Sequence, residues 1–216
     1  MLTSVRVPAP MRPAFELAEA LVKSKFEDLE LDPSQGTIHV GGERYVLVRA
    51  DSFYLGWMSA LRGTFGDEAA SGFIYNTGRE IGRSDSTSFS QRLALTDGVA
   101  RLASGPVHFA HAGWAFVEIF EDSVPAMDDS YFLHYVHPNT FETEVLRARG
   151  LHSSTCACLF SAGYSAGWCS EAFGVEVHAR EITCLARGDS VCEFVMAPEG
   201  RLDEHEARLR AKPRPR

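Results

Sequence analysis

Residues 156–192 decide the fold of this 216-residue chain, and they read CACLFSAGYSAGWCSEAFGVEVHAREITCLARGDSVC. The small residues before Phe173, followed by Gly174, predict a helix over residues 156–173 that a glycine ends. Residues 175–186 and 191–196 are rich in β-branched and aromatic side chains, and the polar turn 187–190 joins them. The stretch therefore predicts a helix followed by a β-hairpin.

Four side chains of this stretch have the composition of a closed zinc site: Cys158, Glu181, Cys184 and Cys192. A turn at Gly188 would return Cys192 to Cys184, while Cys158 would come from the preceding helix. Thiolates suit Zn²⁺, which is a borderline-soft ion, and a carboxylate oxygen can complete the tetrahedron. Because four protein ligands leave no position for water, the expected role of the zinc is structural.

The alternative for these thiols is that they are buried free cysteines, which behave as small hydrophobic residues. In a reducing compartment, an odd count of five cysteines favours metal binding over disulfides. Cys156 would face away from Cys158 on a helix, so we leave it out of the ligand set. His178 is a candidate substitute for Glu181.

Composition and charge narrow the class of protein. The chain is 45% hydrophobic and 23% charged, as expected of a globular domain, and its net charge of -8 argues against nucleic-acid binding. No apolar run is long enough to span a membrane, and the first 13 residues lack the apolar core of a signal peptide. We therefore predict a cytoplasmic protein without membrane contact.

The rest of the chain predicts an α+β domain in which helices pack on one antiparallel sheet. The basic, proline-broken end is expected to be a solvated tail or the start of a linker. The expected elements are a helix over 14–27, a hairpin of 37–40 and 45–48, helices over 51–65, 69–84 and 88–103, strands over 107–120 and 131–136, and a helix from residue 139 or 140 to about 149.

Longer motifs carry a family resemblance. The chain resembles the vinyl-4-reductase-type domain in Cys158-Leu-Phe-Ser-Ala-Gly163-Tyr164-Ser-Ala-Gly167-Trp168, Glu181-Ile-Thr-Cys184 and Gly188-Asp-Ser-Val-Cys192. It resembles more closely the N-terminal aromatic-sensing domain of XylR/DmpR-type transcription activators, through Gly42-Glu-Arg-Tyr-Val-Leu-Val, Gly72-Phe-Ile-Tyr and Gly78-Arg-Glu-Ile-Gly-Arg-Ser-Asp-Ser. Together the motifs cover almost the whole chain.

The resemblance implies a homodimeric sensor that binds zinc through three cysteines and a glutamate and holds a small aromatic or hydrophobic effector. In that family the effector relieves repression of an ATPase that drives sigma-54 transcription. The chain has no Gly-x-x-x-x-Gly-Lys-[Ser/Thr] loop, so an ATPase or other output domain is expected in cis or in trans. The expected parts are a dimerisation part (1–104), a ligand- and zinc-binding part of the vinyl-4-reductase type (105–200) and a basic tail (201–216).

The pocket expected from the resemblance departs from that of the phenol sensors. Counting back from Cys158 without gaps, their pocket histidine and tryptophan fall on Phe109 and His137. A buried, unpaired phenol hydroxyl costs about 1–3 kcal/mol, and Phe109 cannot pair with it, so phenol is not expected as the effector. The expected pocket walls, each of which taken alone is equally well explained as core, are Phe109, Trp114, Val117, Ile119, Tyr135, His137, Tyr164 and Trp168.

Two other functions compete with a sensor. Related domains are associated with vinyl reduction, but the chain has no Gly-x-Gly-x-x-Gly fingerprint and no defensible catalytic triad, so we predict that it is not an enzyme. A structural adaptor is the other rival, because the fold resembles that of vesicle-tethering subunits. The two histidines of each of the pairs His108/His111 and His134/His137 would point to opposite faces of a strand, which argues against chelation of a second metal by one pair. Chelation by one histidine from each pair, across two strands, stays open.

Overall fold

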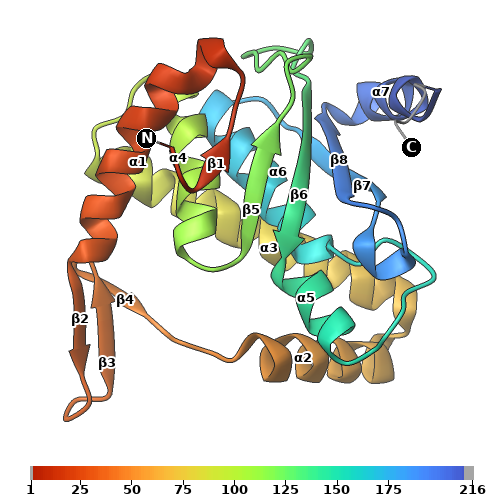
Figure 1. Cartoon of the computed structure of the whole chain (residues 1–216), viewed down its shortest axis with the longest axis horizontal. Helices are drawn as coiled ribbons and strands as arrows, with labels where there is room; N and C mark the ends of the chain where they lie inside the picture. The colour runs from red at the N-terminus through yellow and green to blue at the C-terminus, as the bar shows by residue number, and fades with distance from the viewer. Residues whose placement is uncertain (1, 212–216) are drawn as a thin grey trace.

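A five-stranded sheet lies at the centre of the computed structural model, which describes residues 2–211 (Figure 1). The strand order is β1-β5-β6-β8-β7; β1 pairs with β5 in parallel and the other pairs are antiparallel. Helices pack on both faces, so the predicted α+β class is confirmed. The strands are β1 Val5–Arg6, β5 Ala115–Ile119, β6 Leu133–Thr140, β7 His178–Thr183 and β8 Cys192–Ala197.

The inner face of the sheet carries aromatic side chains in register. On β6, Tyr135 pairs with Phe194 and His137 pairs with Cys192, so these four side chains share one face. Helices α4 Gly98–His111 and α6 Leu159–Phe173 cover this face and form the main core with it.

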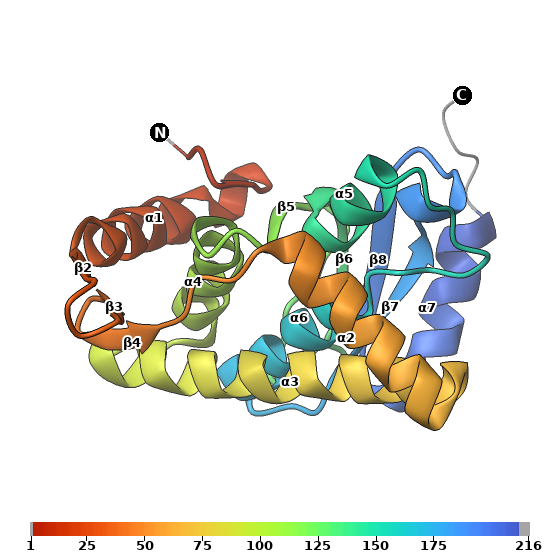
Figure 2. The same cartoon turned by 90° about the horizontal axis from the view of Figure 1, so that it is seen from below.

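The long helix α3 Asp67–Arg92 packs closely along α6 (Figure 2). Glycines line the contact on both helices: Gly78 and Gly82 on α3, and Gly163 and Gly167 on α6. A Cβ atom on any of the four would lie 1.9–2.4 Å from a backbone carbonyl oxygen of the facing helix. The two backbones can therefore approach this closely only where side chains are absent.

The N-terminal part consists of α1 Arg12–Glu27, a small three-stranded sheet and α2 Ala50–Phe65. The predicted helix over 14–27 is confirmed. The predicted hairpin is correct in β3 Thr37–Val40, but β4 Glu43–Tyr45 ends before Val46, and the additional strand β2 Leu29–Asp32 was not predicted. Figure 1 shows residues 46–49 stretched between β4 and α2.

Two predicted elements around residue 100 are wrong. Residues 98–111 form α4 rather than the end of one helix and the start of a strand, and α3 continues to Arg92. The Asp97 carboxylate caps α4 by accepting hydrogen bonds from the amides of Val99 and Ala100. The aromatic and β-branched residues near position 107 suggested a strand, but their burial against α6 and the sheet selects the helix.

The C-terminal third follows the prediction more closely. Thr140 caps α5 Phe141–Ala148, α6 ends before Gly174, and Gly188, with a φ of 96°, follows the short 3₁₀ turn Leu185–Arg187. Helix α6 begins at Leu159 rather than at residue 156.

Part of the expected basic tail is a helix, α7 Glu199–Ala211. Its Leu202 and Leu209 pack with Phe132, Ile182 and Val195 in a separate apolar cluster on the outer face of the sheet. The remaining basic residues, in 212–216, lie outside the described residues.

Candidate metal centre and ligand cavity

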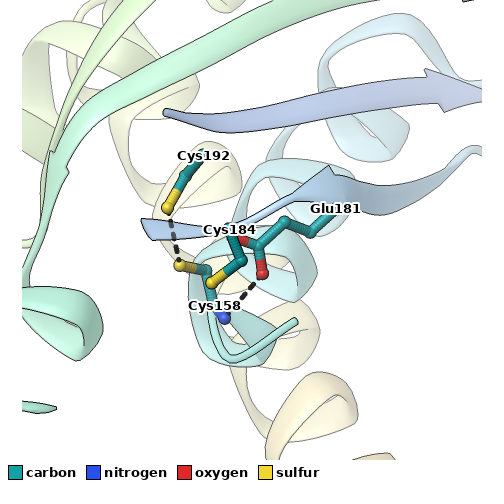
Figure 3. Close-up of side chains that lie close together, drawn as sticks. All are labelled: Cys158, Glu181, Cys184 and Cys192. Carbon is teal, nitrogen blue, oxygen red and sulfur yellow. Dashed lines mark hydrogen bonds between the residues drawn. The ribbon is translucent and has the colours of Figure 1, made fainter. Parts of the chain in front are cut away.

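The four predicted metal ligands lie together at the N-terminus of α6. One ligand atom from each of Cys158, Glu181, Cys184 and Cys192 lies within 4.8 Å of all the others, and all four residues are buried (Figure 3). In tetrahedral zinc-thiolate sites, ligand atoms are about 3.8 Å apart, because zinc-sulfur bonds are about 2.3 Å. The Sγ atoms of Cys158 and Cys192 are 3.5 Å apart, which is close to that value.

The backbone around the cluster presents N–H groups to its acceptor atoms. The amide of Ala157 donates to Cys184 Sγ and the amide of Leu185 donates to Cys192 Sγ, both at 3.4 Å. The amide of Cys158 donates to Glu181 Oε2 at 2.8 Å. Such donors stabilise negative charge on thiolate and carboxylate groups, as ligands of a cation require.

The four ionisable groups of the cluster influence one another. Hydrogen bonds from the Cys158 and Cys192 thiols lower the pKa of the Cys184 thiol. Burial raises the pKa of the Cys158 thiol and that of the Glu181 carboxyl, because a charged form loses its hydration. Glu181 Oε1 is buried without a hydrogen-bond partner among the described residues. A divalent ion would supply both the missing partner and the compensating charge.

The fifth thiol and the substitute histidine lie outside this cluster. Cys156 is half-buried and His178 is on β7, and neither belongs to the group of side chains close enough to share an ion. Cys169 lies further along α6.

A small, mostly buried cavity lies between α4, α6 and the inner face of the sheet. Its volume is about 30 Å³, whereas a cavity that admits benzene measures about 150 Å³. Binding of an aromatic ring would therefore require the walls to move. The cavity is lined by Leu102, Gly105, Pro106, Phe109, Val117, Ile119, Leu133, Tyr135, Tyr164, Ser165, Trp168, Cys169 and Met196.

Six of the eight predicted pocket residues line this cavity: Phe109, Val117, Ile119, Tyr135, Tyr164 and Trp168. Trp114 instead packs against Phe160 and Phe141 and lines surface grooves, because it precedes β5. His137 lies behind the wall, with ring centroids 5.9 Å from Phe109 and 5.2 Å from Tyr135. Whether these residues bind a ligand stays a prediction.

Sequence reasoning missed the contribution of α4 and part of the contribution of the central strands β6 and β8 to the wall. Leu102, Gly105 and Pro106 were missed because the residues after 107 were assigned to a strand. Leu133 and Met196 could have been found from alternation, since Leu133 shares a strand face with Tyr135. Ser165 and Cys169 lie one position after Tyr164 and Trp168, so the helical period extends the same wall.

A chain of hydrogen bonds engages the hydroxyl of Tyr164, one of the residues that line the cavity. Burial lowers the pKa of His108 to about 3, so its imidazole is neutral and has one donor and one acceptor. Tyr164 Oη donates to Asp85 Oδ2 at 2.9 Å and lies 2.9 Å from His108 Nδ1, which must then be the donor. Tyr45 Oη therefore donates to His108 Nε2 at 3.3 Å.

Two buried polar side chains near the cavity are unsatisfied. Tyr135 Oη and both ring nitrogens of His137 have no hydrogen-bond partner among the described residues. Burial lowers the pKa of His137 to about 3, which keeps it neutral. Buried groups of this kind cost free energy while they are unpaired, so a bound molecule that pairs with them gains from the contact.

The members of the two histidine pairs do not come together as ligands of one ion. The expectation that His108 and His111 lie on a strand is wrong, because both are on α4; His111 Nδ1 lies 3.0 Å from the Val107 carbonyl oxygen. On β6, His134 points away from His137 and lies between Asp122 and Glu193, at 2.9 and 3.0 Å.

Two family models match the chain in the expected order. The family described as activator of aromatic catabolism matches residues 26–123, and the vinyl-4-reductase-type domain matches residues 140–198. No curated protein shows significant sequence similarity to the chain.

A solved structure shares the fold. A crystal structure of the phenol-responsive sensory domain of the transcription activator PoxR, with phenol, is 21% identical over 96% of this chain and 100% of that chain, with a TM-score of 0.74. A vinyl-4-reductase family protein from Methanocaldococcus jannaschii is more distant: it is 15% identical over 88% of this chain and 94% of that chain, with a TM-score of 0.44.

The two family models therefore confirm the resemblance that the motifs predicted, and the shared fold agrees with it. Among residues 2–211, none of the helices combines the length and the apolarity that crossing a bilayer requires.

Proposed function

We propose that the chain is a zinc-stabilised sensor domain that binds a small aromatic or hydrophobic effector and regulates transcription or another output. The observation that carries this proposal is the small cavity, whose walls are almost entirely apolar and aromatic and come from α4, α6 and the sheet. The PoxR neighbour, which is described as phenol-responsive, supports the same class of effector.

Zn²⁺ would be held by Cys158, Glu181, Cys184 and Cys192, which join the start of α6 to β7 and β8. The donor set of three thiols and one carboxylate suits this ion. Because Tyr164 and Trp168 follow on the same helix, the metal would also fix one wall of the cavity.

Effector binding would change the conformation of the domain. A ring cannot enter about 30 Å³ unless wall residues shift. The ligand-bound state would therefore differ from the closed one, and an effector acts on an output only through such a difference between two states.

A non-catalytic role is part of the proposal. His108, the buried base that is hydrogen-bonded to the lining residue Tyr164, uses both nitrogens in hydrogen bonds to Tyr164 and Tyr45. It therefore has no free nitrogen with which to activate a nucleophile such as Ser165 or Cys169.

The proposed assembly is a homodimer, formed by the part before residue 105, that controls an ATPase or other output domain in cis or in trans. In support, residues 46–48 are apolar and extended, and Leu47 is 86% exposed. Leu29 and Leu31 on β2 are also exposed and line the same groove as Val46 and Leu47, of about 670 Å³. A cytoplasmic location remains part of the proposal.

Two measurements test it. Native mass spectrometry should find one zinc per chain in a dimer. Calorimetric titration should show binding of toluene or phenol, but not of benzoate, because no basic residue lines the cavity to pair with a carboxylate. Binding of benzoate as tight as that of toluene, or no binding of any of the three, would contradict the assignment of this cavity.

A further inference from the structure

The polar atoms of the cavity wall are not equivalent. Tyr164 Oη is committed to His108 and Asp85, and Trp168 Nε1 donates to the Arg101 carbonyl oxygen at 2.8 Å. Tyr135 Oη is different: it is fully buried and forms no hydrogen bond with any residue that the structure describes. No other oxygen or nitrogen of the lining side chains combines these two properties. Among the described residues, the wall therefore has one fully buried oxygen without a hydrogen bond.

The position of Tyr135 is fixed by its surroundings. Its ring stacks on Phe194 with centroids 5.1 Å apart and planes at 8°, and only 1% of the residue is exposed. Ser165, which also lines the cavity, is close enough to influence the pKa of Tyr135, but the two hydroxyls do not meet the distance and angle criteria of a hydrogen bond. The unused oxygen thus cannot turn to solvent to find a partner.

The chemistry of this oxygen defines what it can bind. Burial raises the pKa of Tyr135 well above its ordinary value, so the hydroxyl stays protonated and can either donate or accept. No charged side chain lines the cavity, so an ionised ligand would lose its hydration without compensation. The ligand must be neutral, and a small hydroxyl or amino substituent would satisfy Tyr135.

We infer that Tyr135 is the specificity-determining residue of the cavity, whose hydroxyl pairs with the polar substituent of a neutral one-ring aromatic effector. This inference rests on the proposed function. It removes the objection that Phe109 leaves a phenol hydroxyl unpaired, because the partner comes from β6 instead. His137 stays behind the wall and does not contact the ligand.

The test compares phenol with toluene, which differ by a hydroxyl in place of a methyl group at nearly the same size. In Tyr135→Phe we expect the Kd for phenol to rise about tenfold, the effect of losing one buried hydrogen bond, and the Kd for toluene to stay within about twofold. The matched control is Tyr131→Phe. Tyr131 is also fully buried with an unpaired hydroxyl, but it does not line the cavity, so both affinities should stay unchanged.

A second measurement needs no substitution. With tyrosine labelled at Cζ by ¹³C, phenol should shift the Tyr135 resonance of the wild-type protein much more than toluene does. An unchanged ratio of phenol to toluene affinity in Tyr135→Phe, or equal shifts with both ligands, would overturn the role of Tyr135. His137 would then be the candidate partner for the polar substituent of the ligand. If neither ligand binds the wild-type protein, the proposed function fails and this inference fails with it.

Discussion

At the scale of single residues, the metal cluster depends on the identity of each side chain. Cys184 and Cys192 come from the two sides of one turn, and both accept backbone N–H groups. Cys156 is near the cluster in sequence but is not among its members. Substitution of Cys184 or Cys192 is therefore expected to have a different effect from substitution of Cys156.

Replacing Cys184 or Cys192 by Ser should abolish zinc binding and lower the free energy of unfolding by more than about 4 kcal/mol, because structural zinc is coupled to folding. Cys156→Ser is the control and should keep one zinc per chain. The measurements are metal content and urea unfolding. A stable, folded protein that carries both substitutions and no metal would refute the closed zinc site.

Two buried histidines should make the free energy of unfolding depend on pH in the acidic range. The pKa of His108 and that of His137 are both about 3 in the folded protein, against about 6.5 when unfolded. Between these two pKa values the unfolded chain binds more protons than the folded protein does. The contribution of the neutral histidines to the free energy of unfolding is therefore fully present above about pH 7 and falls on acidification below pH 6.5. At pH 5 each histidine accounts for a loss of about 2 kcal/mol.

His137→Phe should remove its share of this loss, because a phenylalanine takes up no proton on unfolding. Urea unfolding at pH 7, 6 and 5 should therefore show a smaller decrease for this variant than for wild type. Exposed His152 provides the control, and His152→Gln should follow wild type. Equal decreases in wild type and His137→Phe would show that His137 is not held neutral by burial.

At the scale of elements, the contact between α3 and α6 organises the domain. It brings Asp85 on α3 to Tyr164 on α6, so the same contact that builds the core also orients the cavity wall. The backbone approach depends on four glycines rather than on large apolar side chains.

Gly82→Ala should destabilise the domain by roughly 1–3 kcal/mol or prevent folding, because its Cβ would lie 2.2 Å from the Tyr164 carbonyl oxygen. Gly72→Ala, on the same helix, meets no atom within 4 Å and should stabilise by about 0.5–1 kcal/mol through helix propensity. Thermal and urea unfolding measure both. Similar effects of the two substitutions would contradict the close crossing.

At the scale of the whole molecule, apolar residues are distributed unevenly over the surface. Val46 and Leu47 are 75% and 86% exposed in an extended segment beside the small sheet. Exposure of this kind is typical of surfaces that another protein covers. The predicted homodimer would place these residues in its interface.

Leu47→Glu should weaken dimerisation by at least tenfold, because a charge would be buried without a partner, while zinc content stays at one per chain. Met127→Glu changes a similarly exposed residue in the loop before β6 and should leave the dimer intact. Sedimentation equilibrium gives both dissociation constants. A wild-type monomer at micromolar concentration would rule out the dimer itself.

The sequence alone determined features that depend on local chemistry. Glycine and capping signals located the ends of α5 and α6, and spacing together with ligand chemistry selected the four side chains that the structure brings together as a candidate metal centre. The motifs identified the family because they contain residues whose types cannot be exchanged, such as the thiols and the glycines of α6.

Only the tertiary structure decided features that depend on packing across the chain. Residues 107–111 have the composition of a strand, yet their burial between α6 and the sheet makes them helical, and this change alone placed Pro106 and Gly105 in the wall. Likewise, Tyr135 became distinct from the other aromatic residues only when its hydroxyl was found enclosed and unpaired. Hydrogen-bond satisfaction depends on neighbours that are distant in sequence, so no local pattern could have shown it.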